Sequence, residues 1–256
     1  MKPSLAIEHC VDQSPQWLKK FYVACIFFLK VCLKRIGIIR WLDKQAPQSD
    51  LHHYIRSLFA IHQLEDMIAL DVPWWTYDSI AYLEQYVKNL DYPIHAFEYG
   101  SGASTLWLSK RCQSVISVEH DPKWYSELNA YVKNNGNLTL LLKPYQPTTL
   151  SEESNSYQSI KVPQVDFRKY VESIQSNYRL YDIIVIDGRC RNACLKAAIE
   201  KLNPQGIIIF DNSNRQRYQA SLNQDNIQVK RFKGRVPGSP FASETAIIRL
   251  SASRRS

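Results

Sequence analysis

The stretch from His95 to Glu119 constrains this sequence most, because it joins an apolar strand, a glycine turn, a short helix and a second strand. Residues 96–99 are too few and too apolar for anything but a buried parallel strand. Gly100 and Gly102 lack a Cβ where the backbone turns sharply and can approach a ligand closely. The following helix opens with free N–H groups facing the same point. The pattern predicts a cradle for a nucleotide-containing cofactor.

This cradle differs from the one that binds NAD. A dinucleotide motif has its third glycine where this chain has Thr105. Glu119 ends the second strand 19 residues after Gly100, and a carboxylate there can accept hydrogen bonds from two ribose hydroxyls. The predicted cofactor-binding residues are Glu98, Gly100, Ser101, Gly102, Glu119 and His120.

The segments FEYGSGASTLWLSKR and VISVEHDPKWY resemble the class I S-adenosylmethionine-dependent methyltransferases, and within them a branch often described as uncharacterised bacterial methyltransferases. The resemblance spans roughly Val72 to Leu250. It also rests on VPWWTYDSIAYLE, YDIIVIDGRCRNAC, GIIIFDNSNRQRY and the final FKGRVPGSP and ETAIIRL. It implies an α/β enzyme with S-adenosylmethionine as cofactor and a Rossmann-like, mostly parallel sheet whose last strand is antiparallel.

Apolar segments predict the individual strands of that sheet. Five mostly apolar segments, all but the first rich in Val, Ile or Leu, are typical of strands buried on both faces, at 95–99, 114–119, 138–142, 182–187 and 206–211. Two further segments, 229–232 and 245–250, predict an antiparallel closing pair. The Ser-, Gln- and Pro-rich stretch Tyr145–Gln164 is predicted to be structureless, either as a substrate-side lid or as plain disorder.

The first 70 residues are predicted to be a helical extension, followed by the methyltransferase domain at 71–256. From Trp17 to Ile39, apolar residues recur at helical spacing. The lysines that gather on the other side are Lys19, Lys20, Lys30 and Lys34. The uninterrupted apolar run 21–29 is well short of the ~20 residues that cross a bilayer, and no signal-peptide cleavage site follows. The helix is therefore expected either to lie in the plane of an anionic membrane or to pack on the domain or a second subunit.

Oxygen-bearing side chains end two neighbouring predicted strands. Asp187 closes YDIIVID, and Asp211 and Asn212 close GIIIFDN, at the edge that also holds the glycine turn. Asp187 is the candidate base, and the three residues are a candidate Mg²⁺ site. The set is similar to that of the catechol and caffeoyl-CoA O-methyltransferases, but their lysine base is replaced here by Cys190. The alternative is that Asp187 caps a helix while the other two organise a turn.

Arginines and tryptophans near this edge suggest an acceptor site. The arginines are Arg189, Arg191, Arg215 and Arg217. Guanidinium groups bind carboxylate, phosphate or sulfate with two hydrogen bonds, so an acceptor with an anionic group is expected, with Arg189 as a catalytic residue. Pairing of Arg189 with Asp187 is the alternative. Trp74 and Trp75 are expected either to stack on the acceptor or to belong to the core.

The net charge of +8 is unevenly distributed, with +5 over residues 1–56, −6 over 57–188 and +9 over 189–256. The basic ends favour nucleic acid, an anionic bilayer or an anionic acceptor, or form an ordinary solvated surface. The six cysteines show no paired spacing, which favours free thiols and a cytoplasmic protein, at the inner face of a membrane if the N-terminal helix binds lipid.

The resemblance implies methyl transfer from S-adenosylmethionine to an oxygen, or less often a nitrogen, of a small-molecule or glycan acceptor. One alternative is a nucleic-acid methyltransferase, although residues 187–190 read Asp-Gly-Arg-Cys where such enzymes have an N/D-P-P-Y/F tetrapeptide. The other is a membrane-associated scaffold that binds an adenosyl ligand without catalysis.

Overall fold

The structure is a computed structural model that describes residues 16–60, 64–147, 157–159 and 162–251. It divides into two compact units, residues 1–63 and 64–256. The division falls before the helix at Leu64–Leu70, which the sequence assigned to the extension and the structure assigns to the second unit.

The first unit is helical. Its elements are α2 (Gln16–Arg35), α3 (Ile38–Gln45), the 3-10 turn η1 (Ala46–Gln48) and α4 (Asp50–Leu58). Gly37 separates α2 from α3 with a φ of +82°, a left-handed conformation that favours glycine. Ile39 and Leu42 of α3 are buried, and the Arg56 Nε donates a hydrogen bond of 2.6 Å to Asp43 Oδ1.

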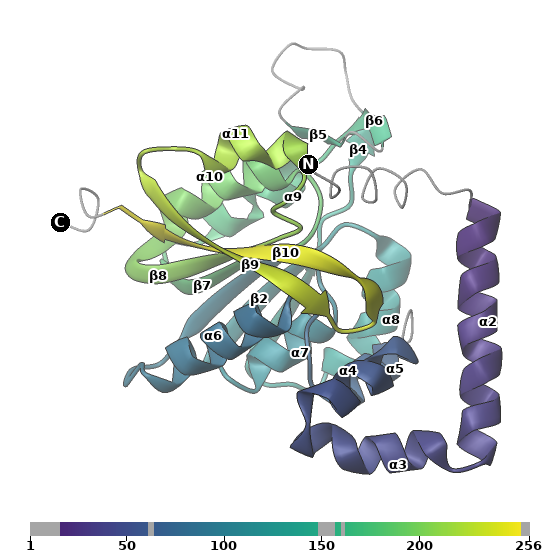
Figure 1. The fold of residues 1–256 in the computed structure, drawn as a ribbon. Coiled ribbons are helices and arrows are strands. Elements are labelled where there is room, and N and C mark those ends of the chain that lie inside the picture. Colours follow the sequence, from purple (N-terminus) through teal and green to yellow (C-terminus); the bar gives the residue numbers. More distant parts are fainter. Residues whose placement is uncertain (1–15, 61–63, 148–156, 160–161, 252–256) are drawn as a thin grey trace, which may run out of the picture. The chain divides into compact units, whose positions relative to one another are not determined.

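The second unit is built on a sheet whose described strands follow the order β3-β2-β1-β7-β8-β10-β9 (Figure 1). The strands are β1 (His95–Tyr99), β2 (Ser114–Glu119), β3 (Leu138–Leu142), β7 (Tyr181–Ile186), β8 (Leu202–Asp211), β9 (Ile227–Val236) and β10 (Ser239–Leu250). The first five are parallel, whereas β10 runs antiparallel to both β8 and β9. The predicted antiparallel closing pair is confirmed, and both of its strands are longer than predicted.

Helices cover both faces of this sheet. One face carries α6 (Tyr77–Lys88) and α7 (Ala103–Ser109), and the other carries α9 (Arg168–Val171), α10 (Arg191–Lys201) and α11 (Gln219–Leu222) (Figure 1). The remaining elements are α5 (Leu64–Leu70), α8 (Pro122–Val132) and the 3-10 turns η3 (Glu172–Ser176) and η4 (Gln216–Tyr218).

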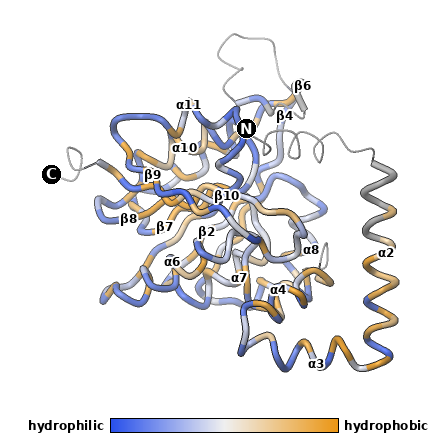
Figure 2. The backbone as a smooth tube through the Cα atoms, in the orientation of Figure 1, coloured by the Kyte–Doolittle hydropathy of each residue, from blue (hydrophilic) through white to orange (hydrophobic). Residues whose placement is uncertain are grey.

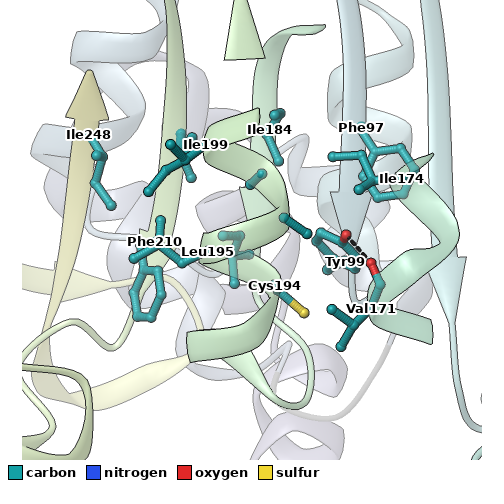
Figure 3. Packing of buried hydrophobic residues seen from close by; sticks show 14 of the residues in the cluster. Phe97, Tyr99, Val171, Ile174, Ile184, Cys194, Leu195, Ile199, Phe210 and Ile248 are labelled. Carbon is teal, nitrogen blue, oxygen red and sulfur yellow. Dashed lines mark hydrogen bonds between the residues drawn. The ribbon is translucent and has the colours of Figure 1, made fainter. Parts of the chain in front are cut away.

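Successive strand residues supply two separate cores, because neighbouring side chains point to opposite faces. Phe97 and Ile184 pack with Leu195 and other residues of α9, α10 and α11, while Ala96 and Ile183 pack on the α6–α7 side. In Figure 3 the Tyr99 hydroxyl donates a hydrogen bond of 2.5 Å to the Val171 carbonyl, which joins β1 to α9. Figure 2 shows hydrophobic residues along β7 and β8 in the middle of this sheet.

The prediction of a structureless segment at Tyr145–Gln164 is wrong for its described residues. Three short strands, β4 (Gln146–Pro147), β5 (Gln158–Ser159) and β6 (Val162–Asp166), form a small antiparallel sheet with the order β4-β6-β5. The guanidinium of Arg168 lies 4.8 Å from the ring centre of Tyr157, just beside this sheet. Backbone pairing between distant short segments organises the region, although its polar composition suggested a loop.

Candidate functional site

The glycine turn lies at the carboxyl edge of the parallel strands. Gly100 has a φ of +93°, and its amide donates a hydrogen bond of 3.0 Å to the Val118 carbonyl. A Cβ added to Gly100 would lie 2.8 Å from backbone atoms of Asp187 and Gly188. The turn therefore fixes the ends of β1, β2 and β7 against one another, and only glycine fits at position 100.

Glu98 supports this turn from beneath. Its carboxylate is fully buried and accepts hydrogen bonds from Ser104 Oγ (2.5 Å), Thr105 Oγ1 (2.5 Å) and Ser117 Oγ (2.6 Å). Burial raises the pKa of this carboxyl to about 7, although the three hydroxyls lower it. With both oxygens used by protein donors, Glu98 holds the start of α7 in place. Its predicted part in the cofactor site stays a prediction.

Glu119 ends β2 and faces the turn. Its Oε2 accepts a hydrogen bond of 3.3 Å from the Ser101 amide, and its Oε1 accepts from the amides of His120 (2.7 Å) and Asp121 (2.8 Å). The Trp124 indole donates a hydrogen bond of 2.7 Å to the Ser101 carbonyl and braces the turn. A carboxylate at the tip of β2 is thus brought against the backbone of the glycine turn, as the sequence predicts.

Buried polar atoms without hydrogen bonds gather around this turn. Among the described residues they include Ser101 Oγ and Tyr170 Oη, while His120 Nδ1 lies 2.7 Å from Glu119 Oε1. The His120 ring lies 5.9 Å from that of Tyr170, and a Cβ added to Gly188 would be 1.9 Å from Tyr170 Oη. Buried polar groups are normally paired, so the hydroxyls of Ser101 and Tyr170 indicate a place where a polar ligand completes the hydrogen bonding.

Gly102 leaves space where such a ligand would approach. A Cβ added there meets only Ser104 Oγ, at 3.9 Å, and its φ of −177° is ordinary extended backbone. The structure of the protein itself therefore does not require glycine at position 102. The residues around the turn fit an adenosyl cofactor on two counts, the open face above Gly102 and the unsatisfied polar atoms beside it.

Asp187 lies at the end of β7, on the other side of the turn from Glu119. Its side chain is 22% exposed, and its Oδ1 accepts a hydrogen bond of 2.7 Å from Arg191 Nη2. Arg191 also donates to the Gly188 carbonyl (3.1 Å) and to the Asp211 carbonyl. Burial raises the pKa of the Asp187 carboxyl, while Arg191 and Arg215 lower it. Asp187 is the partly exposed carboxylate of the crevice.

The predicted Mg²⁺ ligands do not fit a metal site. The guanidinium of Arg191 contacts both acids, with Nη2 2.7 Å from Asp187 Oδ1 and Nη1 3.8 Å from Asp211 Oδ2. Asp211 Oδ1 accepts a hydrogen bond of 3.0 Å from Thr245, and Asn212 donates one of 3.2 Å to Ser243. No cluster of three His, Cys, Asp or Glu side chains suited to a metal occurs among the described residues. The positive charge beside these acids is therefore the guanidinium of Arg191.

The four arginines do not converge on one point. Arg191 is buried between the acids, and Arg217 lies over the Tyr218 ring with a separation of 4.9 Å. Arg189 Nε lies 3.4 Å from His120 Nε2, while Arg215 is close enough to Asp187 to lower its pKa. Arg191 and Arg217 thus make contacts within the protein, whereas Arg189 lies beside His120 and Arg215 near Asp187.

The two tryptophans before α6 have different environments. Trp75 is fully buried, and its ring lies 5.9 Å from that of Trp107 in an edge-on arrangement. Trp74 is 41% exposed. The next residue, Thr76, donates a backbone hydrogen bond of 3.2 Å to Thr245 Oγ1, which in turn binds Asp211. Trp75 therefore belongs to the core, and Trp74 is the one that remains available to a ligand.

Comparison with solved structures shows the fold. An O-methyltransferase from Bacillus cereus in complex with SAH aligns with a TM-score of 0.50 and 16% identity, covering 73% of this chain and 90% of that one. The second unit has the class I methyltransferase fold. A methyltransferase-like protein from Silicibacter pomeroyi aligns at 20% identity with a TM-score of 0.44, covering 66% and 85%. No family model and no curated protein sequence matches this chain.

Several residues of this methyltransferase-fold site were missed or misread in the sequence. Ser117 pairs with Glu98 in the β1–β2 register, and a hydroxyl inside an apolar strand was a usable signal for its role. Tyr170 gave no such signal, because it lies on α9, far from the glycine turn in the sequence. Arg191 was recognised as a cation of the crevice but was assigned to the acceptor instead of to Asp187.

Proposed function

We propose that the second unit binds S-adenosylmethionine at the Gly100–Ser101–Gly102 turn and transfers its methyl group to an oxygen of a small-molecule or glycan acceptor. The observation that carries this proposal is the position of Glu119 and Asp187 on opposite sides of one glycine turn. Glu119 would accept hydrogen bonds from the ribose hydroxyls. The unsatisfied hydroxyls of Ser101 and Tyr170 would find partners on the cofactor or its bound water.

S-adenosylmethionine supplies a methyl group that its sulfonium already activates. The protein then has to align the acceptor and remove its proton, tasks that positioning and one general base can perform. Asp187 is the proposed base, because its carboxylate is the partly exposed one at this edge. Arg191 would keep Asp187 in a fixed orientation through their 2.7 Å hydrogen bond.

Arg189 and Arg215 support an acceptor with a carboxylate, phosphate or sulfate group. They flank Asp187 from two different loops, and the hydrogen-bonding geometry of guanidinium suits such groups. A small anionic acceptor is favoured over nucleic acid because one anionic group could bind both arginines beside His120 and Asp187. A nucleic-acid acceptor or a ligand-binding scaffold without catalysis would each give a different result in the tests below.

Calorimetry tests the cofactor assignment. Purified protein should bind S-adenosylmethionine and S-adenosylhomocysteine with roughly micromolar affinity, near −8 kcal/mol. NAD should bind far more weakly, and equal or tighter binding of NAD would rule out the proposal. Asp187→Asn should keep S-adenosylhomocysteine binding and lose transfer of a labelled methyl group to any acceptor found. Cofactor binding without transfer to small anionic acceptors, glycans or RNA would favour the scaffold.

A further inference from the structure

Helix α2 combines a strongly cationic composition with exposed aromatic side chains. Residues 16–35 hold five cationic residues, Lys19, Lys20, Lys30, Lys34 and Arg35, and no acidic residue. Phe21 is 63% exposed and Phe28 is 71% exposed. Large apolar side chains exposed to water along one helix indicate a surface that binds a protein or a membrane.

The two kinds of residue lie on different sides of α2. At 3.6 residues per turn, Phe21, Cys25, Phe28 and Cys32 form a continuous stripe, since they are spaced by four, three and four residues. The four lysines share the opposite side, although Val23 and Phe27 lie among them. The apolar character along α2 is visible in Figure 2 as repeated hydrophobic segments. Such a helix suits an interface that has an apolar layer on one side and anionic groups on the other.

No described helix is long and apolar enough to cross a membrane. A helix with this composition can instead lie within the interface, with its apolar side among acyl chains and its lysines at the headgroups. A second copy of α2 is a less suitable partner, because two such helices would bring ten cations and no acid together. Nucleic acid would pair with the lysines but would leave the phenylalanine stripe in water.

We propose that α2 attaches this protein to an anionic lipid surface by lying in the plane of the interface. This inference is independent of the proposed methyl transfer, because it concerns only the first unit. It would bring the chain to a membrane whose headgroups carry phosphate or carboxylate groups. The apolar stripe would supply the hydrophobic part of the affinity and the lysines its preference for anionic lipid.

Vesicle flotation tests the proposal with the full chain. Vesicles of phosphatidylcholine alone are compared with vesicles of phosphatidylcholine and phosphatidylglycerol. The wild-type chain should float with the anionic vesicles only, and added salt should weaken the binding. Lys20→Glu with Lys34→Glu should lower partitioning more than about tenfold, since each cation near such a surface contributes roughly fivefold. Phe21→Ser with Phe28→Ser should lower it by at least about tenfold.

Two matched controls separate α2 from general effects of charge and apolarity. Lys88→Glu with Lys133→Glu makes the same charge change at exposed positions of the second unit. Tyr178→Ser with Phe241→Ser removes two exposed aromatic residues from that unit. Both controls should float like the wild type, and thermal unfolding should verify that all four variants are folded.

Several results would overturn the proposal. The first is a wild-type chain that stays soluble with both kinds of vesicle. The second is equal loss of flotation in the α2 variants and their controls. The third is equal binding to neutral and anionic vesicles. The fourth comes from light scattering. If the wild type is a dimer that binds no vesicles, and Phe21→Ser with Phe28→Ser converts it to a monomer, then α2 is a contact between subunits.

Discussion

The guanidinium of Arg191 donates a hydrogen bond of 2.7 Å to Oδ1 of Asp187, one helical turn earlier in the chain. Arg191 is buried, so removing its charge would leave Asp187 and Asp211 close together without a counter-charge. Breaking a buried pair in this way commonly costs about 3–5 kcal/mol. Arg191→Met should therefore lower the free energy of unfolding by about this amount, measured with urea. Arg191→Lys, which keeps the charge, should lower it less, and equal stability of all three proteins would contradict this role.

The same guanidinium leads to a prediction about metals. Because the Arg191 guanidinium already neutralises Asp187 and Asp211 by contacting both, binding of S-adenosylhomocysteine and methyl transfer should be unchanged in excess chelator. Paramagnetic resonance of added Mn²⁺ should show no ion bound at this site in the wild type, so Asp211→Asn should leave the spectrum unchanged. Activity that disappears in chelator and returns with Mn²⁺ would show that the side chains rearrange to bind a metal.

The two glycines of the turn should respond differently to substitution. A side chain at Gly100 would meet backbone atoms at 2.8 Å, so Gly100→Ala should destabilise the protein. A side chain at Gly102 points to open space, so Gly102→Val should keep the thermal stability and abolish S-adenosylhomocysteine binding. Unfolding and calorimetry on the same samples separate the two effects. If Gly102→Val binds S-adenosylhomocysteine as tightly as the wild type does, the cofactor does not bind at this turn.

Glu119 should matter for affinity more than for folding. Glu119→Gln removes the charge that would receive the ribose hydroxyls, and hydrogen bonds to a charged group contribute about 1.5–3 kcal/mol. We expect calorimetry to show S-adenosylhomocysteine affinity weakened by roughly ten- to 150-fold. Glu127→Gln, an exposed change on α8, is the control and should bind like the wild type.

Glu98 should make stability depend on pH. Its pKa is raised by burial from 4.5 to about 7, so the folded protein favours the protonated carboxyl. Its contribution is fully present below pH 4.5 and is lost as the pH rises to about 7, because ionisation then opposes folding. Glu98→Gln cannot ionise, so it should gain stability relative to the wild type across this range. Urea unfolding at several pH values measures the difference, and a constant difference would contradict the raised pKa.

Several strands could be predicted from the sequence because they are short, mostly apolar segments, and the central strand β7 is buried at every residue. Residues 95–99, 114–119 and 138–142 match β1, β2 and β3. The acids at strand ends could also be located, because parallel strands end at one edge. The partner of each acid could not, because it depends on which way a long side chain turns. Arg191 reaches back toward Asp187, and Asn212, with a φ of +51°, directs its amide to Ser243.

The small sheet of β4, β5 and β6 illustrates a second limit. Its strands are two to five residues long, and their pairing joins segments on both sides of a polar stretch. Neither alternation nor composition distinguishes such strands from a loop. Backbone hydrogen bonds between distant residues decide their conformation, and no local pattern records them.

The Tyr170 hydroxyl reaches so close to Gly188 that a methyl group at position 188 would lie 1.9 Å from it. Even the ring carbon that bears the hydroxyl would be only 3.1 Å away, so phenylalanine at position 170 would still be crowded. The two positions are therefore not free to vary separately during evolution. Among descendants of this sequence, any residue larger than glycine at 188 should appear together with a residue smaller than phenylalanine at 170.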